Sequence, residues 1–169
     1  MKKGDTWISA VLYIALGTIV VTILLSAGLP VVNKIRDRNV ALQTKEVMIG
    51  INSAVRTVMR EGPGSQRSLI MDIGRGELTI DNSQETISWN MDSKVVISQI
   101  DLPVREGDLE IVSRKTNVED KYKIELNLRY NGVADIEYNG QNKLTGRNNI
   151  IIKNSGRNGN VIRVEIRQA

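Results

Sequence analysis

The sequence predicts an α+β protein in which one long N-terminal α-helix precedes a strand-rich head. Three patterns predict this fold class: an uncharged apolar run over 8–32, a helical period over 33–61, and a two-residue period from Ser68 onward. The chain of 169 residues has room for one ordinary domain beyond the helix. The expected segments are a short leader (1–4), an apolar helical segment (5–32), an amphipathic helical segment (33–61) and a β-rich head (62–169).

The apolar run from Ile8 to Val32 is long enough to cross a bilayer. A helix rises about 1.5 Å per residue, so about 20 apolar residues span the hydrocarbon core. An ordinary secretory signal has a shorter apolar region of about 7–15 residues. Gly28 and Pro30 lie near the end of the run, and proline removes a helical hydrogen bond, so a kink is expected there. The kink has two open interpretations: a break at the membrane exit and a hinge within an assembly.

The next segment predicts an amphipathic helix with one buried face. Its stripe has alternating spacings of four and three residues. It consists of Val40, Thr44, Val47, Ile51, Ala54 and Val58, widened by Met48, Val55 and Met59. The sequence EGPGSQRS over 61–68 should end the helix, because glycine and proline oppose its continuation. We expect the head to pack on this stripe, chiefly on Val40, Val47, Ile51 and Val58.

The head has the alternation of half-buried strands. In the clearest example, Ile124, Leu126 and Leu128 alternate with polar residues. Nine segments are predicted as strands: 67–73, 76–81, 85–91, 94–100, 108–113, 121–130, 134–139, 149–154 and 160–167. Hairpin signals occur at Asn131-Gly132, Asn139-Gly140 and Asn158-Gly159. Short strands with such turns predict an antiparallel β-sandwich or a small β-barrel-like head.

The composition argues against several classes of chemistry. The chain has no cysteine and no histidine, which removes disulfides, thiolate ligands, cysteine nucleophiles and the commonest general base. The net charge of +4 comes from interleaved charges, so no nucleic-acid partner is predicted. Gly74 and Gly76 are followed by neither a helix start nor a Gly-Lys-Ser sequence, so they predict no phosphate cradle.

Two further groups of residues are expected to be structural. The carboxylates of Asp101, Glu106, Asp108 and Glu110 lack the spacing of a calcium loop. The aromatic side chains of Trp89 and Tyr138 are expected in the core rather than in a sugar site. We therefore predict no enzyme activity, no cofactor and no metal site.

The N-terminus carries a family resemblance. The sequence KKG, a short polar step, the long apolar run and the amphipathic continuation together resemble an archaeal type IV pilin-like precursor with a class III signal peptide. The resemblance covers about the first 60 residues well. It implies that a prepilin peptidase recognises Lys2 and Lys3 and cuts after Gly4, leaving Asp5 as the mature N-terminus. The fifth mature residue is then Ser9, where many bacterial pilins have a glutamate.

The resemblance also implies a function, a location and partners. The chain would be a subunit of a surface filament, anchored in the membrane before assembly and extracellular afterwards, with adhesion among its possible roles. Its partners would be copies of itself, the lipid bilayer, the prepilin peptidase and the assembly machinery. Positive charges flank the run on both sides, so an outside head follows from the resemblance alone. The alternative is a single-pass membrane-anchored β-sandwich binding module that is neither processed nor polymerised.

Overall fold

The computed structural model describes residues 3–141 and 143–169, with side chains from Trp7 onward. Lys2, predicted as a recognition charge, lies outside the described residues. The chain divides into two compact units, Met1–Arg36 and Asp37–Ala169. Helix α1 (Lys3–Glu61) contributes to both units, and it ends where the glycine- and proline-rich segment begins, as predicted.

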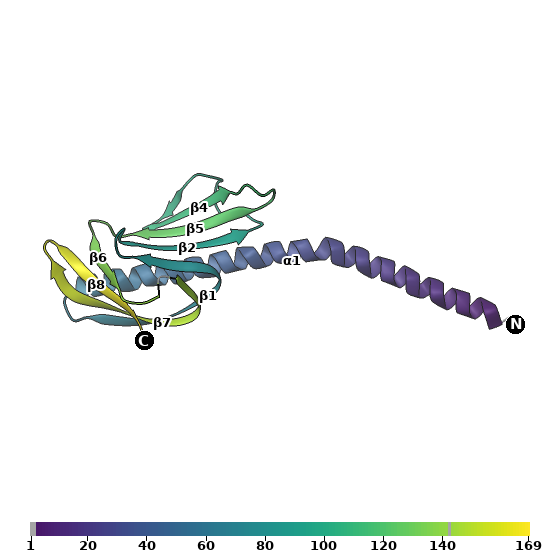
Figure 1. Cartoon of the computed structure of the whole chain (residues 1–169), viewed down its shortest axis with the longest axis horizontal. Coiled ribbons are helices and arrows are strands. Elements are labelled where there is room, and N and C mark those ends of the chain that lie inside the picture. Colours follow the sequence, from purple (N-terminus) through teal and green to yellow (C-terminus); the bar gives the residue numbers. More distant parts are fainter. Residues whose placement is uncertain (1–2, 142) are drawn as a thin grey trace. The chain divides into compact units, whose positions relative to one another are not determined.

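The second unit contains a mixed β-sheet, which Figure 1 shows around the C-terminal part of α1. Its strands are β1 (Gln66–Asp81), β2 (Thr86–Ser93), β3 (Val104–Glu106), β4 (Leu109–Lys115), β5 (Tyr122–Arg129), β6 (Ala134–Tyr138), β7 (Lys143–Asn158) and β8 (Val161–Gln168). Across the described residues they form one eight-stranded sheet in the order β3-β4-β5-β2-β1-β7-β8-β6. Neighbouring strands are antiparallel except β6 and β8, which are parallel. The α+β class with a long helix is therefore correct.

The head is a sheet packed on a helix, where the sequence suggested two sheets or a barrel. One face of the sheet and one face of α1 share a single core. The buried helix residues in this unit are Asp37, Ala41, Thr44, Met48, Ile51, Val55 and Val58. Because the helix supplies the second layer, the sheet needs no facing sheet to bury its apolar side.

The buried stripe of α1 matches the predicted stripe at only half of its six positions. Ile51 and Val58 are in the core, as expected, whereas Val40 and Val47 are only partly buried beside it. Met48, assigned to the margin of the predicted stripe, is fully buried. The pattern of spacings was right. Ala41, Met48 and Val55 occupy the buried positions expected chiefly for Val40, Val47 and Ala54, so the stripe is turned around the helix by less than one residue position.

Several predicted strands and hairpins differ from those in the structure. The segments 67–73 and 76–81 are both parts of β1, and the segment 94–100 is a loop whose one described pairing is the bridge from Ile100 to Ser113. Only Asn158-Gly159 joins two strands that pair, β7 and β8. Asn131-Gly132 and Asn139-Gly140 do not form hairpins, because β6 pairs with β8 and with neither β5 nor β7.

Two isoleucines on α1 test the position of the buried stripe. Ile51 is 1% exposed and Ile49 is 40% exposed. Ile51→Val should lower the free energy of unfolding by about 0.5–1.5 kcal/mol, because it deletes a buried methylene group. Ile49→Val should change it by less than about 0.5 kcal/mol. Urea unfolding of the full chain in mild detergent, followed by circular dichroism, measures both; equal losses would contradict the observed orientation.

Candidate functional site

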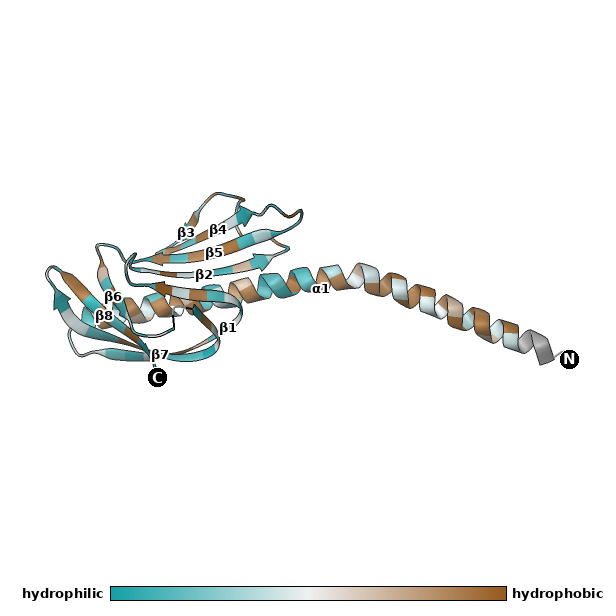
Figure 2. Cartoon of the chain, viewed as in Figure 1, coloured by the Kyte–Doolittle hydropathy of each residue, from teal (hydrophilic) through white to brown (hydrophobic). Residues whose placement is uncertain are grey.

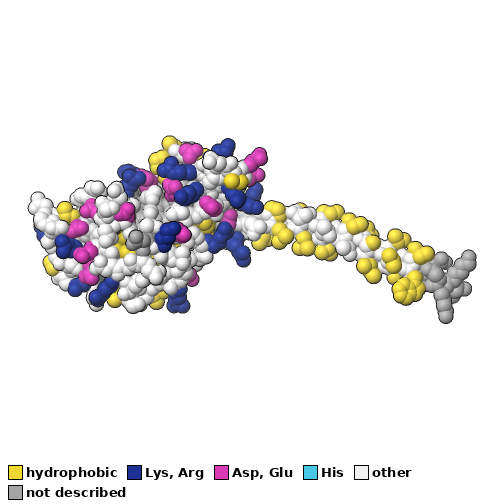
Figure 3. All heavy atoms as spheres, in the orientation of Figure 1, with side chains coloured by type: hydrophobic (Ala, Val, Ile, Leu, Met, Phe, Trp, Pro, Cys, Tyr) yellow, Lys and Arg dark blue, Asp and Glu magenta, His cyan; other side chains and the backbone are white. Residues whose placement is uncertain are grey.

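The first candidate site is the apolar part of α1 in the first unit. Its described side chains are exposed on every face; Trp7 is 76% exposed, Leu12 64% and Ile23 60%. Figure 2 shows this part of the helix in brown and white, and Figure 3 shows hydrophobic side chains along it without a charged group on the visible face. By length and composition the described helix can cross a membrane. A helix that is apolar all round normally lies in lipid or inside an assembly.

Three hydroxyl groups within this segment are bonded to its own backbone. Thr18 Oγ1 donates to the carbonyl oxygen of Ile14 at 2.9 Å, and Thr22 Oγ1 donates to that of Thr18 at 2.7 Å. Ser26 Oγ donates to the carbonyl oxygen of Ile23 at 2.9 Å. These three side chains therefore need no partner from outside the helix, which suits an apolar environment.

The predicted kink and cleavage residues lie within α1. The helix assignment continues through Gly28 and Pro30 without interruption, so the kink remains a prediction. Lys3, Gly4 and Asp5 belong to the helix by their backbone, and their side chains are outside the described set.

The second candidate site, in the second unit, is a buried carboxylate that the sequence reasoning missed. Asp37 is only 4% exposed. Its Oδ1 accepts a hydrogen bond from the guanidinium of Arg75, and its Oδ2 accepts one from the backbone N–H of Lys94 at 2.9 Å. One side chain thus joins α1 to β1 and to the start of the loop after β2. The sequence signal that could have identified Asp37 is helical spacing, because Asp37 lies four residues before Ala41 and seven before Thr44 on the buried stripe.

Arg75 occupies a bulge that interrupts the pairing of β1 with β7. Between the paired positions on either side, residues 74–77 of β1 lie opposite a single residue of β7, Thr145. Trp89 Nε1 donates to the carbonyl oxygen of Arg75 at 3.0 Å, which fixes the bulge from β2. Gly76 has φ +81°, a left-handed conformation that glycine adopts without strain. The paired glycines therefore shape a β-bulge, in keeping with the prediction that they do not cradle phosphate.

A polar cluster joins the C-terminal part of α1 to the β3–β4 turn. Asp108 Oδ2 accepts hydrogen bonds from Arg56 Nε at 2.5 Å and from Asn52 Nδ2 at 2.9 Å. These bonds, that of Arg56 first, lower the pKa of Asp108, and the same bond raises the pKa of Arg56. Tyr130 Oη donates to Asn52 Oδ1 at 3.2 Å, and burial raises the pKa of Tyr130.

The acidic residues near β3 and β4 are committed to ion pairs. Glu106 contacts Lys45 at 2.5 Å, and Glu110 contacts Arg129 at 2.9 Å. Among the described residues no cluster of three histidine, cysteine or carboxylate side chains is suited to hold a metal ion.

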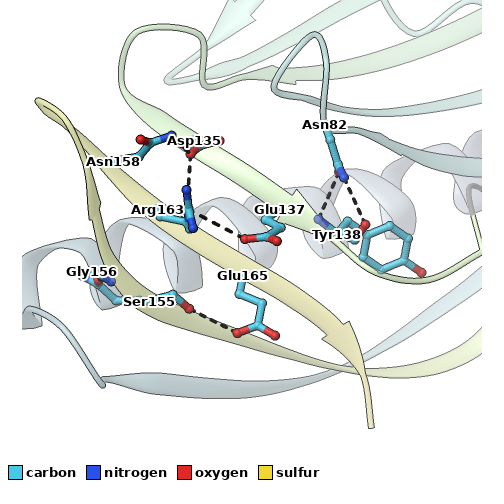
Figure 4. Close-up of polar contacts among 10 residues, drawn as sticks. Asn82, Asp135, Glu137, Tyr138, Ser155, Gly156, Asn158, Arg163 and Glu165 are labelled. Carbon is cyan, nitrogen blue, oxygen red and sulfur yellow. Dashed lines mark hydrogen bonds and ion pairs between the residues drawn. The ribbon is translucent and has the colours of Figure 1, made fainter.

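Polar contacts also close the edge of the sheet at β6 (Figure 4). Asn82 accepts from the backbone N–H of Tyr138 at 3.0 Å and donates to its carbonyl oxygen at 3.1 Å, so its amide replaces a pairing strand. Arg163 lies between Asp135 and Glu137, at 3.4 and 3.8 Å. Blocking an exposed edge in this way limits unwanted strand addition.

Trp89 and Tyr138 are both buried, as expected for core residues.

Comparisons of the chain with family models, with curated proteins and with solved structures find no match. Its function is therefore inferred from the chemistry of its own residues.

Proposed function

We propose that the chain is the precursor of a structural subunit of an archaeal type IV pilus-like surface filament. The observation that carries the proposal is the segment 7–32 of α1, whose apolar side chains are exposed all round. Before processing, this segment would hold the chain in a bilayer. After processing, it would leave the lipid and pack against the same segment of other copies.

Small residues in the segment support close packing between helices. Gly17 and Gly28 have no atom within 4 Å of the position that a Cβ would occupy, so both present bare backbone to a neighbouring helix. Ala10 and Ala15 add small side chains. In lipid, association of helices depends on such close contacts rather than on the hydrophobic effect.

The proposal assigns roles to the N-terminal residues and to the partners. Lys2 and Lys3 would be recognised by a prepilin peptidase that cuts between Gly4 and Asp5. The assembly machinery would then add the subunit to a homopolymer, with the head outside the cell. No cofactor, metal or nucleic acid takes part.

One observation favours the alternative of a membrane-anchored binding module. A shallow polar groove of about 660 Å³ lies over the outer sides of β1, β2, β4 and β5. It is lined by Thr79, Asp81, Gln84, Thr86, Ser88, Arg114, Glu125, Asn127, Arg129 and Asn131. A polar ligand could bind there in a chain that keeps its leader and stays monomeric in the membrane.

Processing at Gly4 separates the two functions. N-terminal sequencing and intact mass of the chain from its native membrane and surface fractions should show that it starts at Asp5. Gly4→Leu should accumulate uncut, because the peptidase requires a glycine before the scissile bond. Gly17→Leu is the matched control and should be cut normally. A wild-type chain that retains Lys2 and Lys3 would favour the binding module, and one that starts near Leu29 would indicate an ordinary signal peptide.

A further inference from the structure

The loop between β2 and β3 exposes a second set of apolar side chains. Residues 95–103, here called the apolar loop, contain one charged residue, Asp101. Val96 is 42% exposed, Ile100 47% and Leu102 52%. Apolar side chains clustered on the surface of a soluble head usually mark a contact with a protein or a membrane.

The backbone of the apolar loop is held in place. The buried Ser113 accepts hydrogen bonds at its Oγ from the backbone N–H groups of Ile97 and Ser98, each at 3.2 Å. The N–H of Asp101 donates to the carbonyl oxygen of Ser113 at 2.8 Å, and Ile97 packs against the core. The exposed side chains are therefore presented by an ordered loop, so binding needs little further ordering.

The apolar loop begins beside Asp37, at the end of the head where α1 enters it from the apolar run. The backbone N–H of Lys94 is bonded to Asp37 at 2.9 Å. Asp37 comes five residues after Val32, the last residue of the run. Five residues span at most about 18 Å, so covalent connectivity limits the distance between the run and this end of the head. The polar headgroup region of a bilayer adds about 5–7 Å on each side of the hydrocarbon core.

Two other exposed apolar residues of the head, Val118 and Val133, fit a membrane contact less well. Val118, at the same end of β4 and β5, is followed by Glu119 and Asp120. Val133 belongs to the opposite end, since the neighbouring Tyr130 is bonded to Asn52. Asn52 lies 15 residues beyond Asp37 on α1, a rise of about 22 Å.

We propose that the apolar loop is a second membrane contact, which seats the head on the lipid surface while the apolar run spans the bilayer. The inference rests on the proposed insertion of that run before assembly. Val96, Ile100 and Leu102 would enter the interfacial region. Leaving water lowers the free energy of apolar side chains there. The contact would fix the rotation of the head above the bilayer before the subunit is incorporated into a filament.

The absence of native cysteine allows a direct test with single-cysteine variants. Leu102→Cys reports the loop, Val133→Cys is the control at the opposite end, and Val20→Cys reports the apolar run. Each full-length chain is labelled with an environment-sensitive fluorophore and reconstituted in phosphatidylcholine vesicles. The labels at 20 and 102 should shift to the blue and be quenched by spin-labelled lipid, while the label at 133 should behave as in water.

The outcomes distinguish the loop from the run. If the label at 20 is quenched but the label at 102 matches that at 133, the membrane contact is wrong and insertion of the run stands. If the label at 20 stays in water, the proposed insertion fails and the inference fails with it. A blue shift at 102 without quenching by spin-labelled lipid would assign the loop to a contact between copies and overturn the proposal.

Discussion

Gly76→Ala should destabilise the head by more than about 4 kcal/mol, a loss that few single substitutions produce. The backbone of Gly76 has φ +81°, which is strained for alanine. A Cβ at this position would overlap the carbonyl oxygen of Asn90 and lie 2.8 Å from Nε1 of Trp89. The first of these neighbours is backbone in the adjacent strand and cannot move aside without breaking the sheet.

Gly74→Ala is the control for this effect. Gly74 lies in the same bulge, and a Cβ there would meet no atom within 4 Å. Its φ is not in the left-handed region. The substitution should change the free energy of unfolding by no more than about 1 kcal/mol, in either direction. Urea unfolding of both variants in mild detergent, followed by circular dichroism, makes the comparison; similar losses would show that the two positions do not differ in packing.

Arg75→Met should lower the free energy of unfolding by about 2–4 kcal/mol, and Asp37→Asn by only about 1 kcal/mol. Removing Arg75 leaves the carboxylate of Asp37 buried, with the N–H of Lys94 as its described partner. Removing the charge of Asp37 leaves Arg75, which is 46% exposed and can be solvated. An asparagine can still accept the bond from Lys94.

The difference between the two variants in lost free energy of unfolding is the quantity that tests this explanation. The same unfolding experiment measures it, with Arg105→Met as the control for loss of an exposed arginine, since Arg105 is 74% exposed in a 3.6 Å pair. That control should change stability by less than about 1 kcal/mol. Equal losses for Arg75→Met and Asp37→Asn would mean that burial of the carboxylate does not determine the energetics of the pair.

The helix and the strand character of the head could be predicted from sequence because both depend on local periodicity. The end of α1 at Glu61 follows from the residues directly after it. The alternation in β5 matches its burial, with Ile124, Leu126 and Leu128 inside. These features need no knowledge of which segments meet.

Pairing between distant segments could not be read from those patterns. The parallel pairing of β6 with β8 depends on where the chain crosses, whereas Asn139-Gly140 only permits it to turn. The segments 67–73 and 76–81 were predicted as separate strands, although pairing with β7 before and after a bulge makes them one strand, β1. The burial of Asp37 could not be predicted, because its partners, Arg75 and Lys94, are 38 and 57 residues away.

The buried stripe of α1 has a mechanical consequence. It extends from Asp37 to Val58, a helical rise of about 32 Å, and its contacts with the sheet lie along that whole length. Tension applied to α1 from its N-terminal side would load all of these contacts at the same time. The Asp37–Arg75 pair, at the N-terminal end of the stripe, would be loaded with them. Such shear loading resists rupture better than sequential peeling, because no contact can fail alone. The head is thus built to bear force along its helix.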